Sequence, residues 1–95
     1  MRFEWDEAKN RSNRRKHGIA FELAQEAFAD PFCLTFPESQ AESEERFWTI
    51  GCISGLMVIV VVHTFRDDRD EEVVRIISAR KATPRERRAY EEADA

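Results

Sequence analysis

Two runs of apolar, mostly β-branched residues dominate the hydrophobic pattern of the chain. The first, Leu56–Val62, leads directly into His63-Thr64-Phe65-Arg66, and the second, Val73–Lys81, follows a charged segment at residues 67–72. This pattern predicts two strands joined by a turn. Because the connection is short, the strands should be antiparallel neighbours, which brings one histidine and several cations to one edge of a sheet.

Further strands are predicted on the amino-terminal side of this hairpin. Arg46–Ile53 has the pattern of a strand that turns at Ser54-Gly55 into the first apolar run, so three strands form a meander. Phe32–Phe36 is a candidate fourth strand, and the acidic segment Pro37–Glu45 is typical of an exposed loop. Phe3–Trp5 is either a short strand or an arm.

Two helices are predicted before the meander. Asp6 as N-cap and Gly18 as C-terminal stop bound a polar helix with cations in its last turn: Arg14, Arg15 and Lys16. These cations oppose the negative end of the helix dipole, which is a sufficient structural reason for them. Apolar residues at helical spacing predict a second, amphipathic helix that ends before Asp30-Pro31: Phe21, Ala24, Ala27 and Phe28.

A third helix has the clearest local signal in the chain. Thr83 is suited to the N-cap, Pro84 to the first helical position, and Glu86 to the third, where it completes a capping box. The helix should run from Pro84 to about Glu92. The expected fold class is therefore α+β: a twisted antiparallel sheet of about three to four strands, packed with two N-terminal helices and a C-terminal helix.

The length of the chain limits it to one hydrophobic core. With 95 residues, a single domain over residues 1–95 is expected. No segment approaches the about 20 apolar residues that span a bilayer, and no signal peptide is evident, so we expect a cytoplasmic protein. Cys33 and Cys52 form no CxxC pair and are expected to be buried, reduced thiols.

The net charge of −4 argues against a nucleic-acid binder, but the distribution of charge changes this conclusion. Residues 2–16 contain six Lys or Arg and three acids, and residues 75–90 contain six cations and one acid. Residues 17–45, in contrast, contain seven acids and no Lys or Arg. The cations are segregated into two blocks, and a local patch is what a polyanion would meet.

The residues at the strand ends have both a chemical and a structural interpretation. His63 can transfer a proton near neutral pH, although a histidine at a strand end is more often a structural hydrogen-bonding group. Arg66, Arg75 and Arg80 can bind phosphate oxygens, or they can pair with nearby acids across the sheet. Strand alternation places Arg80 and Lys81 on opposite faces, so only one shares the face of His63 unless the strand bulges.

Metal catalysis has little support in the sequence. The two histidines, His17 and His63, are far apart, and the acidic turn lacks the glycine and distal glutamate of an EF-hand loop. No P-loop, dinucleotide fingerprint or nucleophile elbow is present. We therefore expect no metal and no cofactor, which leaves acid–base chemistry or plain binding.

Several motifs together resemble the BrnT toxins of bacterial type II toxin–antitoxin systems. The resemblance covers Phe3 to about Glu92, and its strongest amino-terminal element is Lys16-His17-Gly18. The other segments that carry it are Glu4–Asn10, Asn13–Lys16, Ile19–Phe21, Asp30-Pro31, His63-Thr64, Arg75–Ala82 and Glu86-Arg87. It implies a RelE-like fold and a toxin that cleaves RNA without a metal and so blocks translation, the ribose 2′-hydroxyl attacking the adjacent phosphate.

Residue by residue, the resemblance implies an active centre formed by His63, Arg66 and Arg80. His63 would be the general base or acid, and the two arginines would stabilise the transition state. These three side chains should then converge on one phosphodiester. The implied RNA-phosphate contacts are Lys16 and Lys81, and Arg75, one of the strand cations able to bind phosphate oxygens, is a further candidate.

The resemblance also implies a partner, a BrnA-like ribbon–helix–helix antitoxin. Two toxins and two antitoxins would form a heterotetramer that contacts DNA only through the antitoxin. The acidic block from Glu22 to Glu45 is then a solvated face or a site for a basic antitoxin segment. Two other functions stay open at the level of sequence: a non-catalytic RNA- or protein-binding module, and a degenerate toxin that acts as corepressor with its antitoxin.

Overall fold

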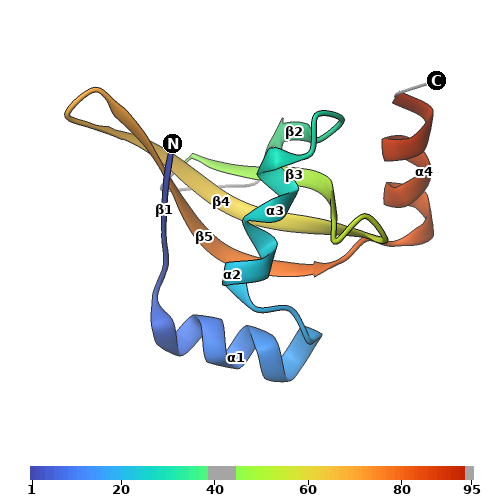
Figure 1. Cartoon of the computed structure of the whole chain (residues 1–95), viewed down its shortest axis with the longest axis horizontal. Coiled ribbons are helices and arrows are strands. Elements are labelled where there is room, and N and C mark those ends of the chain that lie inside the picture. The colour runs from blue at the N-terminus through green and yellow to red at the C-terminus, as the bar shows by residue number, and fades with distance from the viewer. Residues whose placement is uncertain (39–44, 94–95) are drawn as a thin grey trace.

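Five strands form one mixed sheet in the order β1-β5-β4-β3-β2 (Figure 1). This computed structural model describes residues 1–38 and 45–93. The strands are β1 (Arg2–Glu4), β2 (Leu34–Pro37), β3 (Arg46–Ile53), β4 (Met57–Asp68) and β5 (Glu71–Lys81). The meander β3-β4-β5 is antiparallel throughout, as predicted, and β2 adds to β3 as the fourth antiparallel strand.

Within the described residues, four helices accompany the sheet. They are α1 (Glu7–His17), α2 (Phe21–Ala24), α3 (Glu26–Ala29) and α4 (Pro84–Ala93). The caps predicted for α1 are present, since Asp6 accepts hydrogen bonds from the backbone N–H groups of Ala8 and Lys9, and Gly18 has a left-handed φ of 75°. The predicted second helix is instead two short helices, α2 and α3, which meet at Gln25.

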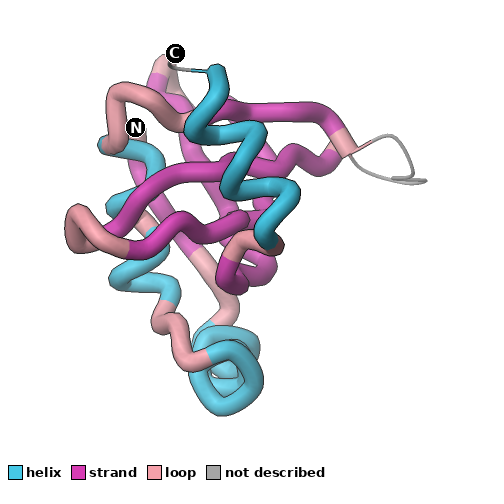
Figure 2. The backbone as a smooth tube through the Cα atoms, turned by 90° about the vertical axis from the view of Figure 1, so that its right-hand side faces the viewer, coloured by secondary structure: helices cyan, strands magenta, loops and turns pink. Residues whose placement is uncertain are grey.

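The helices cover both faces of the sheet. Segments α2 and α3 bury Phe21, Ala24 and Ala27 against one face, which we call the helix face; its strand residues include Ile59, Val61, Ile76 and Ala79. A Cβ at Gly51 would lie 2.5 Å from the carbonyl oxygen of Ala27, so the glycine permits α3 to pack directly on β3. Helix α4 lies on the other face, in front of the strands in Figure 2.

The opposite face, here called the open face, has a smaller core. Ile50, Val58 and Val60 are buried there, with Trp48 and Tyr90 packed against them. Tyr90 of α4 donates a hydrogen bond to Asp30, whose carboxylate also accepts the N–H of Cys52. This contact links the end of α3 to α4 around the end of β3.

The sheet differs from the predicted one in two places. Strand β1 pairs in parallel with β5, which makes the sheet mixed, with five strands. The predicted turn at residues 67–72 is also shorter, because β4 continues to Asp68 and β5 begins at Glu71. Arg69 and Asp70 alone form the turn, both with positive φ (52° and 66°), the geometry of a two-residue hairpin turn.

A β-bulge changes the faces on which the β5 side chains lie. Val62 pairs with Ser78, whereas the next residue, His63, pairs with Ile76, so Ile77 is an extra residue on β5. Beyond the bulge Arg80 pairs with Val60 on the open face, and Lys81 pairs with Ile59 on the helix face. Lys81, not Arg80, therefore shares the face of His63.

None of the helices in residues 1–38 and 45–93 has the length and apolar character needed to span a membrane.

Candidate functional site

His63 lies inside the protein, at the centre of the helix face. Its side chain has no exposed area, and aromatic rings surround the imidazole: the centroids of Phe65, Phe28 and Phe47 are 4.7, 4.8 and 6.1 Å away. Nε2 lies 2.7 Å from the Thr49 hydroxyl, and Nδ1 is buried without a hydrogen-bond partner. Burial lowers the pKa of His63 to about 4, so the ring is neutral at pH 7.

This position argues against the role of general acid or base that the sequence suggested for His63. A general acid or base must come within hydrogen-bonding distance of the group that exchanges the proton. The imidazole is enclosed by the core and cannot touch RNA in this conformation. His63 is therefore a core residue, held by Thr49 and by the surrounding rings.

The predicted catalytic residues do not converge. Arg66 and Arg80 share the open face, but Arg80 pairs with Val60, which is six residues before Arg66 on β4. At the strand rise of about 3.3 Å per residue, their backbones are about 20 Å apart. His63 lies on the other face, so the structure does not assemble the three residues around one phosphodiester.

Arg66 and Arg75 form one cluster with Glu4 at the β1 end of the open face. Nη2 of Arg66 donates to Glu4 at 2.7 Å, and Nη1 of Arg75 donates to the other carboxylate oxygen at 3.1 Å. These hydrogen bonds, Arg66 first, lower the pKa of Glu4. Two arginines share one acid, so the cluster keeps a net positive charge and about half of each arginine side chain is exposed.

Arg80 is held at the other end of the open face, against α4. Its guanidinium donates to both carboxylate oxygens of Glu86 at 2.7 and 2.9 Å, and lies 5.7 Å from the centre of the Trp48 ring. Glu86 is fixed in turn by the capping box, in which it accepts the N–H of Thr83. The Arg80 hydrogen bonds are the main cause that lowers the pKa of Glu86 to about 2. Arg80 is thus a rigidly positioned cation on an aromatic ring.

Lys16 and Lys81 lie apart from the arginines of the open face. Lys16 is exposed in the last turn of α1, and Lys81 is exposed at the end of β5. Helix α1 runs beside the β5 edge, where Asn13 hydrogen-bonds both the N–H and the C=O of Ala79. The two lysines therefore belong to the α1 side of the molecule, which also carries Arg11, Arg14 and Arg15.

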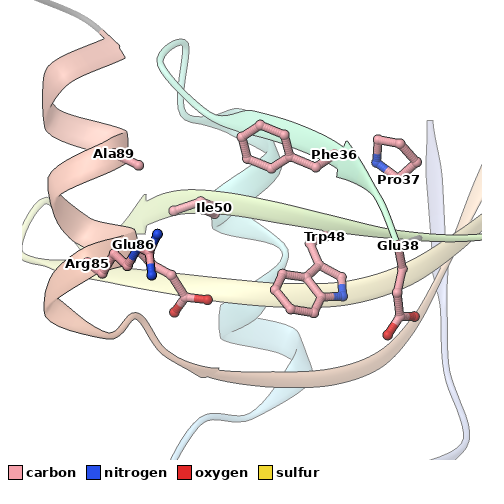
Figure 3. A pocket seen from close by; sticks show the side chains of 8 residues that line it. All are labelled: Phe36, Pro37, Glu38, Trp48, Ile50, Arg85, Glu86 and Ala89. Carbon is pink, nitrogen blue, oxygen red and sulfur yellow. The ribbon is translucent and has the colours of Figure 1, made fainter. Parts of the chain in front are cut away.

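A pocket opens on the face that carries Arg80, between β2, β3 and the first turns of α4 (Figure 3). Its volume is about 550 Å³, within the range of about 300–1,000 Å³ usual for small-ligand sites. The described residues that line it are Phe36, Pro37, Glu38, Trp48, Ile50, Arg85, Glu86 and Ala89. Arg80 is not among these lining residues, but it contacts two of them, Glu86 and Trp48.

Sequence reasoning missed Trp48 and Glu38 as site residues. Phe36 and Trp48 are cross-strand partners, which places two aromatic rings side by side on the open face. The sequence did contain a signal for a binding surface, because Phe36 and Trp48 lie in two predicted strands. A tryptophan in a strand is, however, equally common as a core residue. Glu38 gave no signal, since it was one of several acids in a predicted loop.

The described residues show no grouping that resembles a metal centre. Within residues 1–38 and 45–93, no cluster of three or more His, Cys, Asp or Glu side chains is arranged to hold an ion. The side-chain clusters of the open face consist instead of guanidinium groups, carboxylates and aromatic rings.

The chain is similar to proteins of one family. A family model described as "Ribonuclease toxin, BrnT, of type II toxin-antitoxin system" matches residues 5–86. Among solved structures, the chain is similar to that of the Brucella abortus ribonuclease toxin BrnT, at 33% sequence identity and a TM-score of 0.65. That similarity covers 87% of this chain and 97% of the other. No curated protein gives a significant match.

Proposed function

Because the chain belongs to the BrnT family, the ribonuclease toxins of type II toxin–antitoxin systems, we propose that it is itself an RNA endonuclease that blocks translation. The active site lies on the open face of the sheet, beside Arg80. The observation that carries this assignment is the bidentate hydrogen bonding of Arg80 to Glu86, beside the ring of Trp48; Glu86 and Trp48 both line the pocket. The pair fixes the guanidinium in one orientation, and its remaining N–H groups can donate to phosphate oxygens.

The reaction is a transesterification within the RNA. The ribose 2′-oxygen forms a bond to the adjacent phosphorus, and the bond from phosphorus to the 5′-oxygen of the next nucleotide breaks. One proton leaves the 2′-hydroxyl and one is delivered to the departing 5′-oxygen, so the products are a 2′,3′-cyclic phosphate and a 5′-hydroxyl. Arg80 stabilises the negative charge that develops on the phosphate oxygens.

The remaining cations bind the RNA backbone on either side of the cut. Arg66 and Arg75, which share the single acid Glu4, contact phosphates at the far end of the open face. Lys16 and Lys81 contact phosphates on the side of α1. A protein of net charge −4 can bind a polyanion in this way because its cations are clustered and attract the phosphates locally. Binding through such contacts should weaken steeply with salt.

We assign no metal to the reaction, because guanidinium groups provide the positive charge at the phosphate. The test is cleavage in excess EDTA, with RNA that was itself freed of divalent ions. An unchanged rate supports this assignment. A loss of activity that returns with Mg²⁺ or Mn²⁺ contradicts it.

The antitoxin is, in this proposal, a BrnA-like ribbon–helix–helix protein, and two toxins and two antitoxins form the complex. DNA binds to the complex through the antitoxin. Light scattering of the copurified complex measures its stoichiometry. Operator binding by the toxin alone would contradict the role assigned to the antitoxin.

The function is tested by expressing the chain inducibly in a bacterium, with and without the antitoxin, and by mapping the RNA ends that appear. The proposal predicts growth arrest that the antitoxin relieves, together with 5′-hydroxyl and cyclic-phosphate ends. Harmless expression of folded protein, with no new ends on free or ribosome-bound RNA, would contradict it. That result would favour a non-catalytic module or a corepressor.

A further inference from the structure

The pocket beside Arg80 has features that the cleavage chemistry does not use. We propose that it binds one base of the RNA, guanine in preference to the other bases, and so selects the nucleotide at which the chain cuts. The inference rests on the proposed ribonuclease function, to which it adds sequence specificity. It is carried by two unpartnered polar atoms and two aromatic rings in one pocket.

The aromatic rings provide a surface for stacking. Phe36 and Trp48 project from neighbouring strands into the pocket, and Phe36 is 45% exposed, which is unusual for so large an apolar side chain. Bases of single-stranded RNA stack on such rings whatever their sequence. The rings therefore explain why a base would enter the pocket, but not which base.

Two polar atoms provide the selectivity. Nε1 of Trp48 is a hydrogen-bond donor and Oε2 of Glu38 is an acceptor, and both are buried without a partner among residues 1–38 and 45–93. In Figure 3 the nitrogen of the indole is on the edge that faces Glu38. Buried polar groups are nearly always hydrogen-bonded, so an unpartnered donor and an unpartnered acceptor on two residues that line one pocket suggest that a ligand completes them.

Guanine is the base whose edge matches this pair. Its N1–H and 2-amino groups can both donate to one carboxylate, while its O6 accepts a hydrogen bond from an N–H donor such as the indole. Adenine can donate to the carboxylate only through its 6-amino group, and the pyrimidines are too small to stack and reach both atoms equally well. A carboxylate acceptor beside an N–H donor therefore favours guanine.

Two cations lie at or beside the pocket, where they can contact the phosphates that flank a bound guanosine in RNA. Arg80 lies 5.7 Å from the centre of the Trp48 ring, and Arg85 lines the pocket from the first turn of α4. The hydrogen bonds that fix Arg80 are made to Glu86 and to the carbonyl of Lys81, and Trp48 contacts Arg80 through the face of its ring. Glu38→Gln, and Trp48→Phe, which keeps a ring, leave these hydrogen bonds in place, so base recognition can be separated from phosphate binding by substitution.

The direct test is calorimetric titration of the full chain with nucleoside 3′-monophosphates. We expect the affinity for guanosine 3′-monophosphate to be higher, by about 10-fold at least, than the affinity for the adenosine, cytidine and uridine nucleotides. The inosine nucleotide, which lacks only the 2-amino group, should lose about 10-fold in affinity. Equal affinity for all of these nucleotides overturns the proposal.

Matched variants separate recognition from folding. Glu38→Gln should lose the guanosine preference, and Trp48→Phe, which keeps a stacking ring but lacks the donor, should weaken guanosine binding about 10-fold. The controls are Glu72→Gln, an exposed acid of the hairpin, and Trp5→Phe, whose indole donates instead to Glu7; both should bind as wild type does. A folded Glu38→Gln protein that retains the preference overturns the proposal.

Mapping of cleavage positions on an RNA of random sequence completes the test. Wild type should cut next to guanosine, and Glu38→Gln should cut with a broader choice of base. Cuts that ignore guanosine in the wild type overturn the inference and leave the ribonuclease function standing. Guanosine-selective binding without any RNA cleavage supports the base site and instead contradicts the proposed ribonuclease function.

Discussion

The hydroxyl of Thr49 lies 2.7 Å from Nε2 of His63, inside the core of the helix face. A second hydroxyl, that of the exposed Thr35, lies 2.9 Å from Thr49, so a short hydrogen-bonded chain crosses three strands from the surface to the imidazole. This arrangement makes His63 part of the packing of β2, β3 and β4, on the face opposite the open face.

The first prediction concerns the role of His63. His63→Ala should destabilise the fold by about 2–4 kcal/mol, because it leaves a cavity among three aromatic rings and removes the partner of Thr49. Urea unfolding measures this change. His63→Gln, which keeps a polar group near Thr49, should cleave RNA within a few-fold of wild type under conditions where both are folded. A folded His63→Gln protein that loses about 1,000-fold in rate would restore the catalytic role.

The second prediction is a pH dependence of stability. The pKa of His63 is about 4 in the folded protein and 6.5 as its ordinary value, so between these pH values the unfolded chain binds more protons. Stability should therefore fall as the pH drops from 6.5 to 4, by up to about 3 kcal/mol from this residue, with no contribution above that range.

The carboxylates titrate in part of the same pH window, so the measurement is a difference between two proteins. Unfolding free energies of wild type and His63→Leu are compared from pH 4 to pH 8. The variant should lack the part of the slope that comes from the histidine. Parallel curves would mean that the imidazole is solvated in the folded state.

The third prediction concerns Asn13, which closes the free part of the β5 edge. Its side chain donates to Ala79 O at 2.8 Å and to Ile19 O at 2.9 Å, and accepts the Ala79 N–H at 3.2 Å. Asn13→Ala should cost about 2–3 kcal/mol, because these buried backbone groups lose their partner. Hydrogen exchange at the Ala79 amide should speed up. Ser12→Ala, on the exposed side of α1, is the control, and equal protection in both variants would refute this role of Asn13.

The sequence predicted those parts of the fold whose signal lies within a few neighbouring residues. The α4 capping box is present in the structure with both of its hydrogen bonds, between Thr83 and Glu86. Its residues are three positions apart, so the sequence alone contains the whole motif. The strands of the meander were predicted for a similar reason, since their apolar runs are bounded by turns.

Features that depend on distant contacts were not predicted. A three-residue strand such as β1 has too little pattern to indicate that it pairs with β5, about 70 positions later. The bulge at Ile77 is hidden in a continuous apolar run, where one extra residue changes no polarity. Alternation placed His63 on a face of the sheet, but the sequence did not say that Phe28, from another element, would cover that face.

The acid shared by Arg66 and Arg75 was missed because it is distant in the chain. Glu4 pairs with Arg66 across 62 positions and with Arg75 across 71. The sequence suggested the acids of the hairpin turn as alternatives, but two of these, Asp68 and Glu71, contact Arg2 instead. The pairing of β1 with β5 therefore decides that Arg66 and Arg75 share the single acid Glu4, so that this cluster keeps a net positive charge.

The fourth prediction separates the two roles of Glu86. This residue caps α4 and orients Arg80, so Glu86→Ala should destabilise the protein by about 1–2 kcal/mol and also lower the cleavage rate. Glu91→Ala, an exposed acid further along α4, should change neither. Circular dichroism and the cleavage rate measure the two effects. A loss of helix with full activity would show that Arg80 needs no support from Glu86.

The central claim is that Arg80 stabilises the transition state of RNA cleavage, and the single-turnover rate on a defined RNA tests it most directly. Arg80→Ala should cut about 100-fold more slowly than wild type. Arg80→Lys, which keeps the charge without the bidentate geometry, should recover only part of the rate.

Arg88→Ala, an exposed cation on the same helix as Glu86, is the control for a general loss of positive charge. Arg88→Ala should cleave at the wild-type rate and Arg80→Ala should lose most of its rate, with both proteins folded at the assay temperature. A folded Arg80→Ala protein that cleaves RNA at the wild-type rate would contradict the central claim.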